Sequence, residues 1–312
     1  MEYPIPVVDG VQHRFVSVGG IKMHYAEAGQ GEPLVLLHGG PQHWYMWRHQ
    51  IAPLAKQYRV ICPDLRGFGW SDAPRDGYEK EQLAADVMAL LDAIGINRFK
   101  LMGHDWGGLV GFLLCLHHPA RVVSYLALNI VHPFQKIDAR AFSLWRFWYQ
   151  FVIATPWLGY YLTRGQAFLR LLLRLGVYRK QWSEDELRIY TSLYKDPARA
   201  KAWVLIYRTF LLRELMPMTL GRYRRHRLTT PTLIYFGVKD FALSPALLRG
   251  YEPYADNLTV EFVQDCGHFI AEEQPELVTR RALDFFNEQD QVGTAQPGAP
   301  VDGPRPAGSA RR

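Results

Sequence analysis

Short apolar segments alternate with amphipathic stretches through most of this 312-residue chain, and one long segment interrupts the alternation. The apolar runs and the helix-like stretches between them are at 34–37, 47–57, 58–62, 83–94, 99–102, 106–118 and 122–128. Strands that alternate with helices in this way form a parallel sheet covered by helices on both faces. An antiparallel hairpin at 13–18 and 21–27, turning at Gly19-Gly20, precedes them. The sequence therefore predicts an α/β fold.

The interruption lies at 133–227, where aromatic and long aliphatic residues dominate and no strand alternation is visible. Strands resume at 232–236 and 259–263, with a helix expected near 245–251 between them and a closing amphipathic helix after them. We therefore predict the following division: a core domain at 1–132 and 228–288, a helical lid at 133–227, and a disordered Pro/Gly/Ala-rich tail at 289–312.

Composition narrows the function classes. The net charge is +6, but no nucleic-acid motif accompanies the basic runs at 164–180 and 222–227, so we expect a solvated surface and no nucleic-acid partner. Three scattered cysteines without a CxxC favour a reducing cytoplasm over a disulfide framework or a cysteine metal site. Neither a signal peptide nor an apolar stretch of about 18 residues is visible, so secretion and membrane spanning are not expected.

Four predicted strands end in segments that could bind a ligand, because ligands in open α/β sheets bind beyond the carboxyl ends of the strands. These segments are HGGP at 38–41, GHDWGG at 103–108, GVKD at 237–240 and DCGH at 265–268. GHDWGG has the pattern of a nucleophile elbow, in which small residues permit a sharp strand-to-helix turn. Its central residue, Asp105, is a carboxylate that can attack carbon without a base. Taken alone, Asp105 also fits an ordinary helix cap.

Asp240 and His268 complete the order nucleophile, acid, histidine along the chain. Three such placements at three strand ends favour a catalytic triad over unrelated residues. We expect His38 and His104 to be hydrogen-bonding residues that support their turns.

In order and spacing these segments resemble the α/β-hydrolase fold, an eight-stranded, mostly parallel sheet with an inserted helical lid, over residues 10–288. Within that fold they resemble the epoxide hydrolase and haloalkane dehalogenase branch, which uses an Asp nucleophile. The resemblance implies that Asp105 is the nucleophile, that His268 activates water and that Asp240 orients His268. It also implies an oxyanion hole formed by two backbone N–H groups, those of Gly40 and Trp106.

The residues of the predicted lid help to identify the leaving group of the substrate. Epoxide hydrolases resemble one another in two lid tyrosines that hold the epoxide oxygen, and the contexts of Tyr149 and Tyr207 resemble theirs. Packing is the alternative for both, because the lid contains several other tyrosines. The resemblance thus implies an epoxide hydrolase that forms a vicinal diol. We expect His38, Trp148 and Pro41, which resembles the family's cis proline, to contribute to the substrate pocket.

Two other functions stay open. A haloalkane dehalogenase would use the same triad, with Trp106 as a halide ligand, although Gly40 stands where many of these enzymes have Asn. A non-catalytic binding protein is the second, and it would be expected to lose a triad member.

The lid composition favours a lipophilic epoxide, with water as the only cosubstrate. The apolar residues concerned are Phe142, Leu144, Trp145, Phe147, Trp148, Phe151, Trp157 and Leu158. The same stretch could contact a membrane surface, but Pro156 and Gly159 interrupt it. No cofactor or metal motif is present, and a homodimer stays open.

Overall fold

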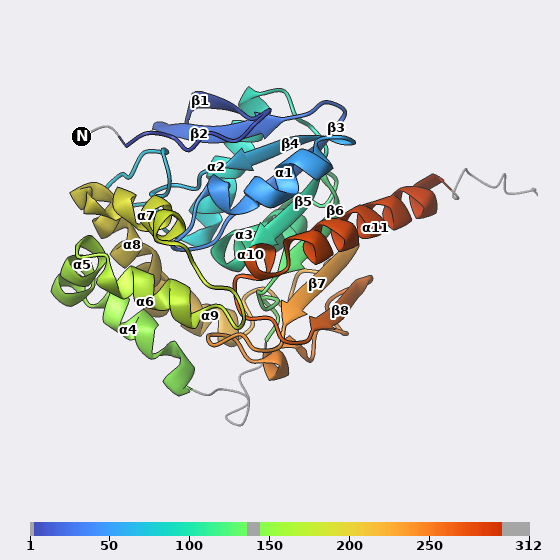
Figure 1. Cartoon of the computed structure of the whole chain (residues 1–312). Helices are drawn as coiled ribbons and strands as arrows, with labels where there is room; N and C mark the ends of the chain where they lie inside the picture. Colours follow the sequence, from blue (N-terminus) through green and yellow to red (C-terminus); the bar gives the residue numbers. More distant parts are fainter. Residues whose placement is uncertain (1–2, 136–143, 295–312) are drawn as a thin grey trace, which may run out of the picture.

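The computed structural model describes residues 3–135 and 144–294. Its strands are β1 (Gln12–Val18), β2 (Ile21–Ala28), β3 (Glu32–Leu37), β4 (Tyr58–Pro63), β5 (Phe99–His104), β6 (Val122–Leu128), β7 (Thr232–Gly237) and β8 (Leu258–Val263). They form one sheet in the order β1-β2-β4-β3-β5-β6-β7-β8 (Figure 1). The pairs β1–β2 and β2–β4 are antiparallel, and all other neighbours are parallel. The predicted eight-stranded, mostly parallel α/β sheet is confirmed.

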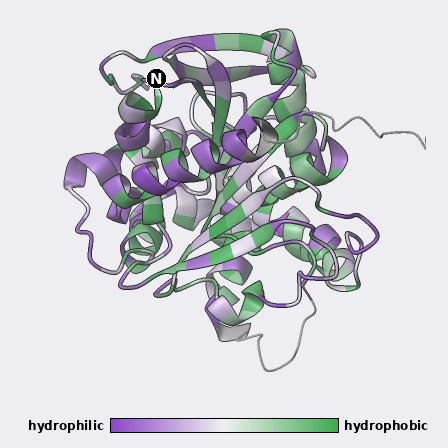
Figure 2. Ribbon diagram, turned by 90° about the vertical axis from the view of Figure 1, so that its right-hand side faces the viewer, coloured by the Kyte–Doolittle hydropathy of each residue, from purple (hydrophilic) through white to green (hydrophobic). Residues whose placement is uncertain are grey.

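Helices cover both faces of the sheet. The helices of the core are α1 (Arg48–Leu54), α2 (Lys80–Ala93), α3 (Asp105–His117), α10 (Ile270–Glu273) and α11 (Pro275–Thr294), with short 3₁₀ turns η1 (Trp44–Trp47) and η5 (Pro245–Leu248). In β3, Val35 and Leu37 pack with α2 and α3, whereas Leu34 and Leu36 pack with α1 and α11. This is the two-residue alternation of a strand buried on both sides. Figure 2 shows hydrophobic residues along the central strands and many hydrophilic residues on the helices and loops around them.

Between β6 and β7, the regular elements of the described residues are all helices. They are η2 (Leu144–Phe147), α4 (Trp148–Ala154), α5 (Pro156–Arg164), α6 (Ala167–Leu175), α7 (Glu184–Ser192), η3 (Leu193–Lys195), α8 (Pro197–Thr209), the π-helix η4 (Phe210–Glu214) and α9 (Leu215–Thr219). We call residues 144–227 the helical insertion. It lies to one side of the sheet in Figure 1, where α4, α5 and α8 pack against one another.

Two boundaries differ from the sequence expectations. The helix expected near 245–251 is only the turn η5, because Arg249 is already extended and Gly250 after it adopts a positive φ of 82°. The closing helix α11 continues to Thr294, so residues 289–294, expected in the disordered tail, are helical. The reason is that Pro and Gly, which break helices, are absent from 289–292. The rest of the expected tail, 295–312, lies outside the described residues.

In the described part of the chain, no helix has both the length and the apolar character needed to cross a membrane.

Candidate active site

Asp105 lies at a tight turn between β5 and α3. Its φ is 49°, a left-handed conformation that side chains other than Gly rarely adopt. Neighbouring glycines permit the turn: a Cβ on Gly103 would lie 2.7 Å from the oxygen of Gly107, and a Cβ on Gly39 would collide with the side chain of Asp105. The predicted nucleophile elbow is therefore present as backbone geometry.

Two backbone amides hold the Asp105 carboxylate. The Gly40 N–H donates to Oδ2 at 2.9 Å, and the Trp106 N–H also donates to the carboxylate. Helix α3 starts at Asp105 itself, and the residue in the cap position is His104, whose side chain makes no capping bond. The bond from Gly40, on the loop after β3, is not part of a helix cap, so capping alone does not account for the position of this carboxylate. Burial raises the pKa of Asp105 overall, although the charge of His268 and the two amide bonds act in the opposite direction.

His268 connects the other two strand ends. Its Nδ1 lies 2.8 Å from Asp240 Oδ2, and its Nε2 lies 3.9 Å from Asp105 Oδ1. Asp240 follows β7, and its Oδ1 accepts two backbone bonds, from Ala242 at 2.7 Å and Leu243 at 3.0 Å. The three predicted triad residues thus come together, and Asp240 is held so that its second oxygen faces His268.

The charges of the triad raise the pKa of His268 and lower that of Asp240. Burial opposes a charge on His268, but the Asp240 carboxylate, its hydrogen bond and the Asp105 carboxylate outweigh burial and raise the pKa to about 9. Burial would likewise raise the pKa of Asp240, but the His268 charge and the bonds that Asp240 accepts lower it overall. In the free protein at neutral pH, His268 is therefore protonated between two carboxylates.

Asn129 belongs to this group and was not predicted. It directly follows β6 with a φ of 41°, and its Nδ2 donates to Asp240 Oδ2 at 2.9 Å. Its Oδ1 accepts the Gly237 N–H at 3.0 Å, which ties the ends of β6 and β7 together. The available signal was its place after the predicted strand at 122–128, the same place that Asp105 has after β5.

His104 and His38 support the turns, as expected. The His104 ring lies 2.9 Å from the His268 carbonyl oxygen through Nε2, and burial lowers its pKa to about 3, so it donates as a neutral ring. His38 Nε2 accepts the Leu65 N–H at 3.0 Å, and its Nδ1 lies 3.0 Å from the Gly39 oxygen.

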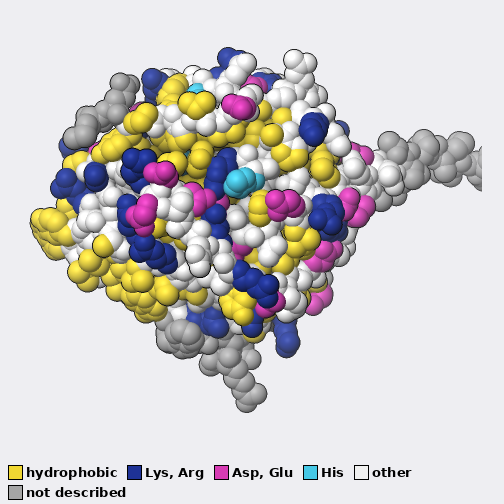
Figure 3. Space-filling model, in the orientation of Figure 1, with side chains coloured by type: hydrophobic (Ala, Val, Ile, Leu, Met, Phe, Trp, Pro, Cys, Tyr) yellow, Lys and Arg dark blue, Asp and Glu magenta, His cyan; other side chains and the backbone are white. Residues whose placement is uncertain are grey.

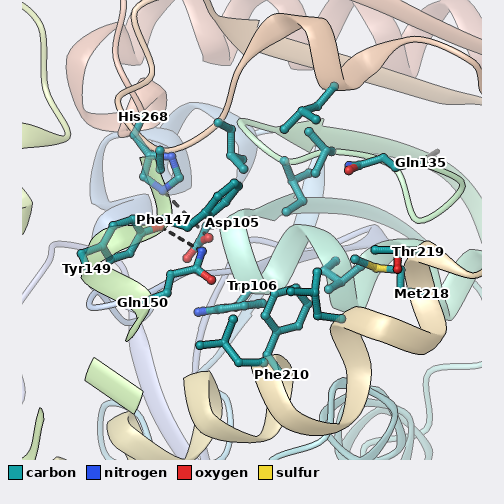
Figure 4. A pocket seen from close by; sticks show the side chains of 18 of the residues that line it. Asp105, Trp106, Gln135, Phe147, Tyr149, Gln150, Phe210, Met218, Thr219 and His268 are labelled. Carbon is teal, nitrogen blue, oxygen red and sulfur yellow. Dashed lines mark hydrogen bonds and ion pairs between the residues drawn. The ribbon is translucent and has the colours of Figure 1, made fainter. Parts of the chain in front are cut away.

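A cavity of about 130 Å³ opens above Asp105, between the core and the helical insertion. Figure 4 shows Asp105 and His268 on the core side and Tyr149 and Gln150 on the insertion side. Its lining is mostly apolar: Trp106, Leu109, Ile130, Val131, Phe147, Phe151, Phe210, Leu211, Leu215, Met218, Ala242, Leu243 and Leu247, with Gln135 and Thr219 as further polar members. The arrangement suits a lipophilic molecule with one polar reactive group.

The expected pocket residues divide into two sets. Tyr149 lines the cavity, and its hydroxyl accepts a hydrogen bond from Gln150 Nε2 at 3.3 Å. Tyr207 is buried beside it, with ring centroids 6.1 Å from Tyr149 and 5.2 Å from Trp106, but it is not part of the lining. Burial, followed by nearby negative charge, raises the pKa of both phenols, so both stay protonated.

His38, Pro41 and Trp148 are not among the residues that line the cavity, which corrects that expectation. His38 is buried in its turn, and Pro41 follows a cis peptide bond and accepts a hydrogen bond from Tyr194 at 3.1 Å. Trp148 points outward and is 41% exposed.

Of the lid residues expected to line or support an apolar pocket, Phe147 and Phe151 line it, whereas Trp157 and Leu158 are exposed. Phe142 and the side chains of Leu144 and Trp145 lie outside the described residues. Among described residues, no group of three or more His, Cys, Asp or Glu side chains could hold a metal ion.

Comparison with known proteins identifies the family. The protein-family model for the alpha/beta hydrolase fold matches residues 32–275 of this chain. The chain is 31% identical to a soluble epoxide hydrolase from Corynebacterium sp. (strain C12) over 88% of this chain and 97% of that one, and 29% identical to human epoxide hydrolase 4 over 89% and 79%. The solved structure of epoxide hydrolase CorEH without ligand is similar with a TM-score of 0.79 at 30% identity, covering 89% of this chain and 99% of that one. The protein belongs to the α/β-hydrolase fold family, and within that family it resembles epoxide hydrolases.

Proposed function

We propose that this protein hydrolyses epoxides to vicinal diols through a covalent ester on Asp105. The observation that carries the proposal is the setting of this carboxylate. One oxygen, Oδ2, is held by the Gly40 N–H at 2.9 Å, and the other, Oδ1, lies 3.9 Å from His268 Nε2. The similarity to epoxide hydrolases over nearly the whole chain supports the same reaction class.

In the first step, Oδ1 of Asp105 attacks an epoxide carbon. The new bond is the ester C–O bond, the epoxide C–O bond breaks, and its electron pair stays on the leaving oxygen. An alkoxide is a stronger base than a phenolate, so a neutral tyrosine can protonate it. Tyr149 is placed to do so because it lines the cavity, and its neighbour Tyr207 is the second candidate donor.

In the second step, water attacks the ester carbonyl carbon of Asp105. The 3.9 Å gap between His268 and Asp105 is too long for a direct hydrogen bond, and it leaves His268 Nε2 directed at the approach to that carbon. His268 takes the proton from water and Asp240 stabilises the resulting charge. Oδ2 then carries the negative charge, where the amides of Gly40 and Trp106 stabilise it. The intermediate then collapses: the bond between the carboxyl carbon and the substrate oxygen breaks, and that oxygen takes the proton from His268 as the diol leaves. The second water proton, left on the Asp105 carboxyl group, returns to the tyrosinate and restores the free protein.

We further propose that residues 133–227 act as a cap domain over the core and select a lipophilic substrate. The insertion supplies Tyr149, Gln150, Phe151 and much of the apolar lining, while the core supplies Asp105 and His268.

Dehalogenation is the second candidate, and one observation favours it. The indole N–H of Trp106 is buried beside the Tyr207 hydroxyl, which interacts with it without a well-formed hydrogen bond. Because Trp106 also lines the cavity, this N–H could stabilise a halide as it leaves.

Trapping the ester separates these functions. The variant His268→Gln lacks the water-activating base, so it should accumulate the ester when it is incubated with an aryl epoxide and a haloalkane of different mass. Peptide mass spectrometry should then show the Asp105 peptide heavier by the whole epoxide. A gain equal to the haloalkane minus its hydrogen halide would instead identify a dehalogenase. Absence of any adduct across a broad panel would contradict both reactions and favour a binding protein.

A further inference from the structure

Helix α5 exposes its large apolar side chains and buries its small ones. Gly159 and Thr163 are buried, and a Cβ on Gly159 would collide with a backbone oxygen of α4. Trp157, Leu158 and Tyr161 face outward and are 77%, 49% and 62% exposed. A surface helix normally directs its large apolar residues to the core. Pro156 and Gly159 therefore do not interrupt this surface: Pro156 begins the helix, and Gly159 lets it pack closely.

A second exposed stripe lies on η4 and α9. Leu212, Met216 and Leu220 are 70%, 65% and 76% exposed, and their spacing of four residues places them along one side of the helical segment. Their neighbours Leu211 and Leu215 line the cavity instead. The stripe therefore borders the cavity on the outside of the molecule.

These exposed residues are concentrated on the insertion. Eleven of the fourteen exposed large apolar side chains in the described residues belong to 144–227, and one of them, Phe151, also lines the cavity. Figure 3 shows hydrophobic side chains gathered at the left and lower-left margin, over α4 and α5 in the view of Figure 1, with Lys and Arg beside them. An exposed apolar area of this kind marks an interaction surface.

The charge of the insertion differs in sign from that of the rest of the chain. Residues 144–227 contain 16 Lys and Arg and 5 Asp and Glu, a formal charge of +11, whereas the whole chain has +6, so the remaining residues carry −5. Exposed arginines continue directly after the stripe, at Arg222 and Arg225. A second copy of the insertion is a poor partner for this surface because the two would repel each other.

We propose that the outer surface of the helical insertion docks on an anionic lipid bilayer. Exposed Trp, Leu and Met side chains among arginines suit the boundary between headgroups and acyl chains, where apolar side chains insert and cations meet anionic headgroups. Because Phe151 is both exposed on this surface and part of the cavity lining, a lipophilic molecule can pass beside it from the bilayer toward Asp105. The docking itself does not rest on the proposed function; the passage of substrate does.

Co-sedimentation of the full chain with sucrose-loaded vesicles tests the proposal. Vesicles of phosphatidylcholine containing about one third phosphatidylglycerol should bind the wild type, pure phosphatidylcholine vesicles should bind it at least about tenfold more weakly, and added salt should weaken binding. The double variant Trp157→Ser/Met216→Ser should also bind at least about tenfold more weakly. Both positions are exposed, so the fold should be kept, and the melting temperature checks this.

The matched control is Val7→Ser/Phe262→Ser, which removes two exposed apolar side chains outside the insertion and should bind like the wild type. Lack of wild-type binding, or equal losses in both double variants, would overturn the proposal. A wild-type dimer in sedimentation velocity that Trp157→Ser/Met216→Ser dissociates would overturn it too, by assigning the surface to a second copy. Asp105→Ala should bind vesicles normally, so failure of the proposed chemistry and failure of docking are distinguishable.

Discussion

The α/β core and the helical insertion contribute to one cavity by different physical means. In the core, Asp105, Asn129 and Asp240 directly follow or closely follow strands whose backbones are fixed by sheet hydrogen bonds. In the insertion, Tyr149 and Phe210 lie on packed helices, and Phe210 lies in a π-helical segment, an irregularity common near functional sites. The core therefore fixes the reacting groups, and the insertion shapes the space that a substrate must enter.

A largely buried ion pair joins the two regions. Lys80 of α2 donates from Nζ to Glu214 of η4 at 2.8 Å and to the Ile206 oxygen at 3.0 Å, and its Nζ lies 4.5 Å from the centre of the Trp106 ring. Because removing one member of a buried pair leaves an uncompensated charge, this junction resists separation of the two regions. The core and the insertion thus differ in what they contribute to the cavity, and not in how firmly they are joined.

The largest expected effect comes from the core. Replacing Asp105 by Ala removes the proposed nucleophile, and epoxide turnover should fall by roughly 10⁵-fold, as for other residues that form a covalent intermediate. Steady-state diol formation measures this loss, and the melting temperature should show that the fold is kept. Wild-type turnover in Asp105→Ala would remove the proposed mechanism altogether.

A smaller effect is expected from the insertion. Tyr149→Phe should slow ester formation by about 10²-fold, because the alkoxide loses its proton donor, while hydrolysis of the ester should be almost unchanged. Tyr207→Phe should cost less, since Tyr207 does not line the cavity. Single-turnover kinetics separate the two steps, and Tyr161→Phe, at an exposed position, is the matched control. If Tyr149→Phe slowed ester hydrolysis more than ester formation, the proposal that the insertion acts in ring opening and not in hydrolysis would be contradicted.

The sequence predicts the positions of the core site residues better than those of the insertion, because strands follow a simple rule that packed helices lack. A strand has a period of two and ends at a recognisable turn, so the positions of Asp105, Asp240 and His268 relative to one another follow once the strands are identified. Asn129 was not predicted, because a single Asn after a strand matches no motif. Its position after β6 was nevertheless as informative as that of Asp240 after β7.

The insertion offers no such rule. Its apolar residues at helical spacing do not reveal which face packs inward, and α5 places Trp157 outward and Gly159 inward, against the usual pattern. Gln150, next to Tyr149, became recognisable as a pocket residue only when the helices were in place. Trp148, expected in the pocket, is turned to the surface instead.

The smallest expected effect is a change in the pKa of His268 between the free protein and the ester, and it involves core residues alone. The negative charge of Asp105 is one of the causes that raise the pKa of His268 to about 9, and the ester has no such charge. The protonated imidazole is therefore less stable in the ester, and the pKa of His268 falls there. Ester hydrolysis, which needs neutral His268, should rise about tenfold per pH unit and level off below pH 9.

NMR titration of His268 in the free protein should give the higher value, and stopped-flow hydrolysis of the preformed ester should give the lower one. Asp240→Asn should lower the free-protein value further, because burial is then opposed mainly by Asp105. Tyr149→Phe should leave both profiles in place, since the tyrosine acts only in ring opening. If both titrations gave the same pKa, the charge of Asp105 would not govern His268, and the two-step use of this histidine would lose its physical basis.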